Sequence, residues 1–403
     1  MSSSQPNEIP KSLPSHDSPN LTLSHPTPPE CIKIWTSTAT TWSDGLPLSV
    51  HLKESEHMTM VPLARDNQMT LWILVDKGRS TAQRPRRIYS SCETFRKRAL
   101  MADTDGAITE GLMHGIASVF CPVEFRGDGF ARRLMRDLAE HLRIWQAHGE
   151  RVFGSVLFSD IGREYYGKLG WELGGGNLHV EIRAREVGTS MVVKDVLVED
   201  VEGLCKRDEE MLRKVMGVPY KERRVTVIPD QEHMGWHWGK EAYACYYLFG
   251  KEPHAKGAIA GRVIGHRVWA LWTHRYYKQQ LDADPTDNVL YILRLVVEQD
   301  ETASRLPLDA DKSPPDEIYG QQLVYLKAVL QAAQNEAYKW QLGTVQLWDP
   351  TPLVMRMLKK MDFGSEVVER KEDGLACLMW YGDKGGKAAS SPLWMNNEHY
   401  AWV

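Results

Sequence analysis

The sequence predicts an α/β protein in which two layered units of sheet and helix follow one another along the chain. Strand-like apolar runs alternate with stretches of helical period in the first half, and the second half ends on the same strand–helix–strand–helix order. At 403 residues the chain is long enough for two or three domains. Its 42% hydrophobic and 25% charged residues are ordinary for a globular protein.

Residues 1–30 are predicted to be a disordered tail. They contain seven Pro, seven Ser and two Thr, and they contain no aromatic residue. Such a segment buries too little apolar surface to offset the entropy lost on ordering. We therefore expect ordered structure to begin near Cys31–Trp35.

The first unit, residues 31–185, is predicted from alternating strand and helix patterns. Phe130, Leu134, Met135 and Leu138 recur at helical spacing, which predicts an amphipathic helix up to Trp145. Gly170 ends a second, short helix. In chain order, the predicted strands are Met69–Lys77, Ile88–Phe95, Ile116–Val123 and Val152–Phe158, and the short helix is Ile161–Leu169.

The second unit, residues 186–381, is interpreted as a structural duplication of the first. Thr351 is a suitable N-cap and Pro352 a suitable first residue for its last helix. Residues 382–403 are predicted to be a linker followed by a tail that docks back on the protein through Trp394, Tyr400 and Trp402. The predicted elements are a strand at Val289–Val297, a helix at Leu323–Tyr338, a strand at Thr344–Trp348 and a helix to Met361.

Charge and targeting patterns exclude several classes of protein. A net charge of −4 disfavours a nucleic-acid partner, so the basic residues between Arg79 and Arg98 are interpreted as solvated strand ends. The sequence has no apolar run long enough for a membrane span and no secretory signal, so a cytoplasmic protein is expected. The six cysteines lie far apart, and no metal site is predicted.

A glycine-rich turn between a predicted strand and the amphipathic helix carries the clearest functional signal. Arg126, Gly127, Asp128, Gly129, Phe130 and Ala131 would present successive backbone amides, a helix N-terminus and a fixed cation. This combination predicts a site for a phosphate or pyrophosphate. It lacks the Gly-Lys-Ser/Thr of a P-loop and the third glycine of the dinucleotide-binding motif.

A second motif follows after the next predicted strand. The stretch Tyr165-Tyr166-Gly167-Lys168-Leu169-Gly170-Trp171, together with Pro122–Met135, resembles the paired motifs of the Gcn5-related N-acetyltransferases (GNAT). The resemblance covers roughly residues 33–185. It implies a mixed, twisted GNAT sheet, acetyl-CoA as cosubstrate and direct transfer of the acetyl group to an amine.

The resemblance also implies roles for individual residues. The amides from Arg126 to Ala131 would bind the pyrophosphate of coenzyme A, with pantetheine lying between two splayed strands. Backbone groups near Cys121, Pro122 and Val123 would polarise the thioester carbonyl. Tyr166 would be the general acid that protonates the departing sulfur.

The general base is less strongly indicated, because an acceptor amine can lose its proton to any suitably placed carboxylate or histidine. Glu93 is preferred, since a carboxylate among strand-forming residues is unusual. Glu110, His114 and Glu124 are alternatives, and so is a terminal carboxylate at Val403.

The second unit departs from the motif. No Arg/Gln-x-x-Gly-x-Gly/Ala follows Val289–Val297, so this half is interpreted as a degenerate GNAT-like domain that closes the acceptor site. The layout resembles the fungal lysine N6-acetyltransferases, on the stretches Ser91–Lys97, Val119–Gly127 and Leu290–Arg294. That resemblance implies free L-lysine as acceptor, in lysine catabolism. Arg294 would meet the acceptor carboxylate or form an interdomain salt bridge.

Two other functions remain open at this point. The first is acetylation of a protein or peptide, which would need an open groove. The second is a non-catalytic protein that binds coenzyme A. The leading interpretation is an N-acetyltransferase for a small amine, without a nucleic-acid or membrane partner.

Overall fold

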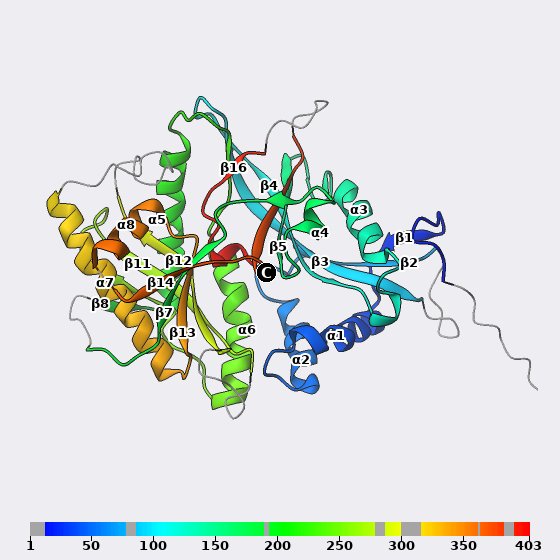
Figure 1. Ribbon diagram of the computed structural model, residues 1–403, viewed down its shortest axis with the longest axis horizontal. Coiled ribbons are helices and arrows are strands. Elements are labelled where there is room, and N and C mark those ends of the chain that lie inside the picture. Colours follow the sequence, from blue (N-terminus) through cyan, green and yellow to red (C-terminus); the bar gives the residue numbers. More distant parts are fainter. Residues whose placement is uncertain are drawn as a thin grey trace, which may run out of the picture.

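Two mixed β-sheets with helices on their outer faces form the protein (Figure 1). The computed structural model describes residues 13–77, 86–188, 193–278, 287–299, 316–361, 363–382 and 391–403. The basic residues Arg79 and Arg84 and most of the predicted linker 382–391 lie outside these ranges. The α/β class with mixed sheets is confirmed.

The first sheet has the order β1-β2-β3-β4-β5-β15-β6, and β9 and β16 extend it beside β3. Neighbouring strands run antiparallel except in the pairs β4–β5 and β9–β16. Its strands are β1 (Leu21–Ser24), β2 (Met69–Asp76), β3 (Ile88–Ala102), β4 (Ile108–Phe120), β5 (Val152–Ser159), β6 (Glu172–Leu173), β9 (Arg224–Val227), β15 (Leu375–Trp380) and β16 (Leu393–Trp394).

The second sheet has the order β14-β7-β13-β12-β11-β10-β8, with one parallel pair, β12–β13. Apolar residues alternate towards a core that this sheet shares with its covering helices. Its strands are β7 (Leu178–Arg183), β8 (Val193–Val196), β10 (Gly257–Ala260), β11 (Val268–Arg275), β12 (Val289–Val297), β13 (Thr344–Trp348) and β14 (Ser365–Glu369).

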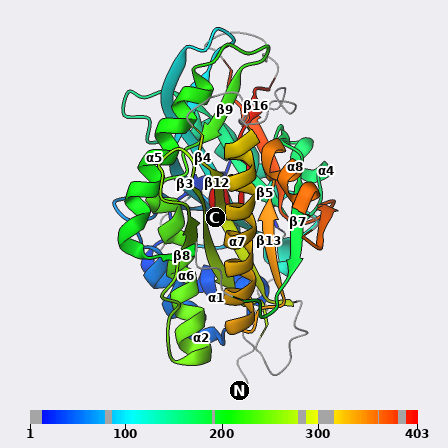
Figure 2. The same ribbon diagram turned by 90° about the vertical axis from the view of Figure 1, so that its left-hand side faces the viewer.

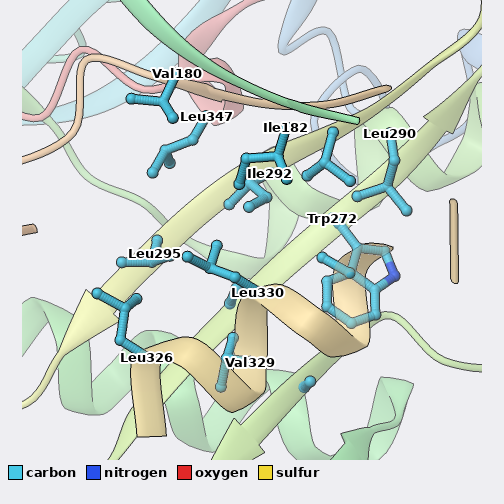
Figure 3. Close-up of a cluster of buried hydrophobic side chains, with 14 of the residues drawn as sticks. Val180, Ile182, Trp272, Leu290, Ile292, Leu295, Leu326, Val329, Leu330 and Leu347 are labelled. Carbon is cyan, nitrogen blue, oxygen red and sulfur yellow. The ribbon is translucent and has the colours of Figure 1, made fainter. Parts of the chain in front are cut away.

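The helices cover the two sheets and the space beside them. α7 crosses the outer face of the second sheet (Figure 2). Figure 3 shows Leu326, Val329 and Leu330 of α7 directed at strand residues such as Ile292. The helices are α1 (Pro28–Trp42), α2 (Leu48–Met58), α3 (Phe130–Leu142), α4 (Glu164–Gly167), α5 (Val198–Met216), α6 (Gln231–Phe249), α7 (Asp316–Lys339) and α8 (Pro352–Met361), with 3-10 turns η1 (Val123–Phe125) and η5 (His399–Ala401).

A parallel strand pair with a crossover helix occurs in both halves. In the first half α3 connects β4 to β5, and α4 follows. In the second half α7 connects β12 to β13, and α8 follows. The strong period of α3 has a direct structural cause, because Phe130, Leu134, Met135 and Leu138 are all buried against the first sheet.

Each half contributes strands to the other half's sheet, which corrects the predicted domain boundaries. One of them is β9, which lies in the predicted second unit and pairs with β3 of the first sheet. β7 lies before the predicted boundary at residue 185, yet it pairs with β13 and β14 of the second sheet. β15 comes from the predicted second unit, yet it lies between β5 and β6 of the first sheet. A boundary drawn in sequence order cannot detect such exchanges, because strand pairing is set by contacts distant in the chain.

The prediction of a disordered tail to residue 30 was wrong for its described part. Leu21–Ser24 forms β1, which pairs with β2, and Leu21 is buried. Helix α1 begins at Pro28, where Thr27 and Glu30 form a capping box. The Glu30 carboxylate also binds Arg86. The segment from Leu21 to Glu30 is thus ordered by strand pairing at the edge of the sheet and by one ion pair, although its composition predicts little buried apolar surface.

The C-terminal segment, residues 391–403, packs against both sheets. Tyr400 is fully buried, and its hydroxyl donates to the carbonyl of Val227 at 2.7 Å. Glu398 lies 3.0 Å from the guanidinium of Arg294. The buried ammonium of Lys97 on β3 donates to the carbonyl of Ala401 at 3.0 Å. These contacts fix the position of the last residues, Trp402 and Val403.

Lys97 makes the stability of this packing depend on pH. Burial lowers the pKa of its amine to about 7, whereas an unfolded lysine holds its proton until about pH 10.4. Between these values the unfolded state binds more protons, so the free energy of unfolding rises with pH, by at most about 1.4 kcal/mol per pH unit. We expect Lys97→Met to remove this rise. Urea denaturation of both proteins from pH 7 to 9 measures it, and equal slopes would contradict the shifted pKa.

Candidate active site

The predicted anion-binding turn forms an exposed loop at the N-terminus of α3. Gly127 and Gly129 have φ values of 86° and 84°, which only glycine adopts readily. Arg126, Gly127 and Asp128 are exposed. Nε of Arg126 donates to the carbonyl of Cys121 at 3.0 Å, which ties this side chain to the end of β4. The loop amides and the unpaired N–H groups of the first helical turn give it the chemistry of a pyrophosphate site.

Strands β4 and β5 separate beside this loop. Their parallel pairing ends at Ile116 and Leu157, although β4 continues to Phe120 and β5 to Ser159. A bulge in β4 accompanies the separation, because Glu93 pairs with Ala117 but Ser91 pairs with Phe120. Ser118 lies in the bulge with a φ of 51°. The last residues of β4 therefore have no β5 partner, and their backbone groups remain available on that side.

A cavity opens where the two strands separate. Both Glu93 and Tyr166 line it, so the structure brings the preferred base and the preferred acid to one space. Its strand walls include Ile116, Ala117, Ser118 and Val119 of β4, and Leu157 and Phe158 of β5. Further walls come from β2, α1, α2, α6, the end of β11 and the C-terminal segment.

Glu93 is half-buried on β3 and has one hydrogen-bond donor. The hydroxyl of Ser118, from the bulge opposite, donates to Oε2 of Glu93 at 3.0 Å. Burial raises the pKa of the Glu93 carboxyl above its usual range, while this hydrogen bond and the charge of Lys240 act against the rise. A carboxylate with a raised pKa is the better proton acceptor, so this environment suits a general base.

Tyr166 lies on α4 with its ring buried in the core of the first sheet. Burial, reinforced by the neighbouring Tyr165, raises the pKa of the Tyr166 hydroxyl above its usual range. The hydroxyl therefore keeps its proton at neutral pH. The next residue, Tyr165, is only partly buried, and the two rings meet edge to face with centroids 5.1 Å apart.

The other predicted bases occupy different places. His114 is fully buried on β4 outside the cavity, and burial lowers its pKa to about 4. Glu110 is paired with Arg98 and Arg213. Glu124 is exposed on η1. Val403 does line the cavity, beside Trp402.

Arg294 does not reach the cavity, which corrects one of its two predicted roles. Its Nε and Nη2 donate to both carboxylate oxygens of Asp208 on α5, at 2.7 and 3.0 Å, and Glu398 lies on its other side. The side chain is almost completely buried. Arg294 thus holds the C-terminal segment against α5 and β12.

Several charged cavity residues were not predicted. They are His51 and Glu54 from α2, Asp160 after β5, Lys240 from α6 and Arg275 at the end of β11. None of them lies in a motif. Three elements, α2, α6 and β11, and the segment after β5 bring them together from both halves of the chain. The only sequence signal was indirect, namely the expectation that the second half closes the acceptor site.

Comparisons with known proteins identify the family of the chain. The family model for the LYC1 GNAT-like C-terminal domain matches residues 177–403. The chain belongs to this family, within the GNAT superfamily. The resemblance drawn from the paired motifs is therefore confirmed.

Individual relatives of this LYC1-like chain are distant. A lysine acetyltransferase of Yarrowia lipolytica is 25% identical over 235 residues, which cover 48% of this chain and 58% of that protein. The chain thus matches less than two thirds of that relative's length. The structures of GCN5-related N-acetyltransferases from Kribbella flavida and Anabaena variabilis are 16% and 11% identical. They cover 89% of this chain, and 69% and 72% of their own chains, with TM-scores of 0.46 and 0.49.

The described ranges hold no group of three or more His, Cys, Asp or Glu side chains placed to bind a metal ion. Within the same part of the chain, no helix has both the length and the apolar character of a membrane span.

Proposed function

We propose that this protein is an acetyl-CoA-dependent N-acetyltransferase for a small amine, and that its acceptor is the N6 amine of free L-lysine. The observation that carries the proposal is the cavity at the separation of β4 and β5, which Glu93 and Tyr166 both line. Membership of the GNAT superfamily supports the reaction class. The name of the Yarrowia lipolytica relative supports lysine.

The proposed reaction divides the work between these two residues. Glu93 accepts a proton from the acceptor ammonium, directly or through water, and the free amine attacks the acetyl carbonyl carbon. Backbone donors at the end of β4 stabilise the oxygen as it becomes negative. The carbon–sulfur bond then breaks, and the hydroxyl of Tyr166 gives its proton to the departing thiolate. The nitrogen then loses its second proton, which restores the Tyr166 hydroxyl. The products are the amide and coenzyme A, and the remaining proton is held by Glu93.

The enclosure of the cavity supports a small acceptor over a protein. The second half contributes Trp236, Lys240 and Arg275, and the C-terminal segment contributes Trp402. These side chains form part of the cavity wall, together with residues of the separated strands. A peptide acceptor would need an open groove there. All six cysteines are free, which is consistent with the proposed reducing, cytoplasmic location.

Thiol release from acetyl-CoA tests the proposal directly. The full chain is incubated with L-lysine, a polyamine, an aminoglycoside or a lysine-containing peptide, and the acetylated product is identified by mass spectrometry. Acetylation of lysine at N6 alone is expected. Turnover with the peptide alone would show that the acceptor is a peptide and not free lysine. A rise in melting temperature with coenzyme A but no turnover on any amine would favour the non-catalytic alternative.

The pyrophosphate site gives a separate prediction. A Cβ on Gly127 would meet nothing within 4 Å, and both Asp and Asn tolerate positive φ. Gly127→Asp should therefore raise the KM for acetyl-CoA about tenfold over Gly127→Asn, because only Asp places a negative charge beside the phosphates. Steady-state kinetics and melting curves of both variants measure this. Equal KM values for the two variants would show that the pyrophosphate of coenzyme A does not bind beside residue 127.

A further inference from the structure

The charges around the cavity are divided between the two halves of the chain. Among the described lining residues, the side-chain carboxylates of Glu54, Glu93 and Asp160 come from the first half. The cations Lys240 and Arg275 come from α6 and β11 of the second half. The two signs also meet within the cavity, because Lys240 lies 3.5 Å from Glu54, so a bound molecule can contact both carboxylates and cations.

Arg275 is held rigidly at this cationic wall. Its Nη2 lies 2.8 Å from a carboxylate oxygen of Asp44, in the turn after α1. The rings of Tyr277 and Trp402 each lie 5.3 Å from the centre of its guanidinium group. These contacts fix the plane of the guanidinium, so little conformational freedom is lost when it binds a ligand.

The donors of Arg275 are not all used within the chain. Its Nε is buried and has no hydrogen-bond partner among the described residues. An arginine has five N–H donors in a fork that matches a carboxylate. Lys240, the second cation, lies 3.5 Å from Glu54, which is a loose ion pair. Both cations thus retain capacity for a further anionic group.

Apolar side chains also line the cavity. Ile34, Trp35, Met58 and Trp236 line the cavity together with Leu71. A short chain of methylene groups can pack against these side chains, with an amine at one end and an anion at the other.

We propose that Arg275, assisted by Lys240, binds a carboxylate of the acceptor, so that this site selects a diamino acid over a diamine. The proposal rests on the proposed function, since it names the group that the same site recognises at the end remote from the reacting amine. Arg275 thus takes the role that the sequence analysis considered for Arg294, namely binding of the acceptor carboxylate. The acceptor carboxylate would lie on the Arg275 and Lys240 wall, and the reacting amine beside Glu93.

The test compares L-lysine with 1,5-diaminopentane, which is lysine without its carboxylate. Wild type should prefer lysine in kcat/KM by about 100-fold, because a site built for a polar group discriminates strongly against an analogue that lacks it. Arg275→Gln should lose about 100-fold on lysine, mainly through KM, and should change little on the diamine. Arg183→Gln removes an exposed arginine of β7, outside the cavity, and should behave as wild type.

Asp44→Asn separates recognition from a purely structural ion pair. This variant weakens the Arg275–Asp44 contact but leaves the guanidinium in place, and it should keep the preference for lysine. If Arg275→Gln and Asp44→Asn both lose activity equally on both amines, Arg275 is a structural link to the α1 turn and the proposal fails. Equal use of both amines by wild type would also overturn it, while leaving the N-acetyltransferase function intact.

Binding provides a readout independent of turnover. Calorimetric titration of L-lysine into wild type saturated with coenzyme A should detect binding that Arg275→Gln loses. Lysine binding that is unchanged by Arg275→Gln would contradict the assignment even if acetylation were slow. Acetylation of neither amine, with no lysine binding, would reject the proposed lysine acceptor and this inference together.

Discussion

Tyr166→Phe should reduce turnover by roughly 10²–10⁴-fold, with little change in the KM for acetyl-CoA. The substitution removes the hydroxyl that we assign as proton donor to the thiolate and leaves the ring, which is buried in the core of the first sheet. Because burial keeps the Tyr166 pKa above its usual range, the hydroxyl is protonated at neutral pH in the wild type. The loss should therefore be chemical rather than structural.

Tyr165→Phe is the matched control for this variant. The two tyrosines are neighbours on α4, but Tyr165 is only partly buried and does not line the cavity. Its variant should retain nearly wild-type turnover. Melting temperatures of both variants show whether the fold persists, and single-turnover measurements isolate the acetyl-transfer step. If Tyr165→Phe lost most of its turnover while Tyr166→Phe kept normal turnover, the general acid would be Tyr165 and not Tyr166.

The parts of the fold that could be predicted are those with a local signal. Helix α3 was evident because its apolar residues recur every three or four positions, and the observed helix buries that face. The turn before it was evident because two closely spaced glycines permit backbone conformations that other residues rarely adopt, and both glycines do have positive φ. The short helix at Tyr166 belongs to a motif of contiguous residues. In each case the determining interactions lie within a few residues of one another.

The parts that escaped prediction depend on distant contacts. Nothing in Leu375–Trp380 shows that this strand pairs with β5 rather than with a strand of its own half. Likewise, Leu21–Ser24 is ordered by pairing with β2, and composition contains no record of that pairing. Arg275 and Arg294 both lie in apolar strands and look alike in sequence. Only the structure shows that Arg294 is satisfied by Asp208 whereas Arg275 lines the cavity.

Glu93→Gln is expected to lower kcat/KM for the acceptor at neutral pH by about 100-fold or more. The amide oxygen can still accept the hydrogen bond that Ser118 donates to the carboxylate in wild type, so the bulge of β4 should persist. What the amide cannot do is accept a proton from the acceptor ammonium. Glu124→Gln, on the exposed η1 turn, makes the same chemical change outside the cavity and should leave kcat/KM unchanged.

The pH profile identifies Glu93 more specifically than the loss of activity does. Since burial raises its pKa, wild-type kcat/KM should fall on the acid side at a pH above the usual range of a glutamate. Below that pH Glu93 is protonated and can no longer act as base. In Glu93→Gln, kcat/KM should no longer fall at this pH. Its remaining pH dependence should come only from protonation of the acceptor amine. An acidic limb that survives in the variant would assign the proton to another cavity carboxylate, Glu54 or Asp160.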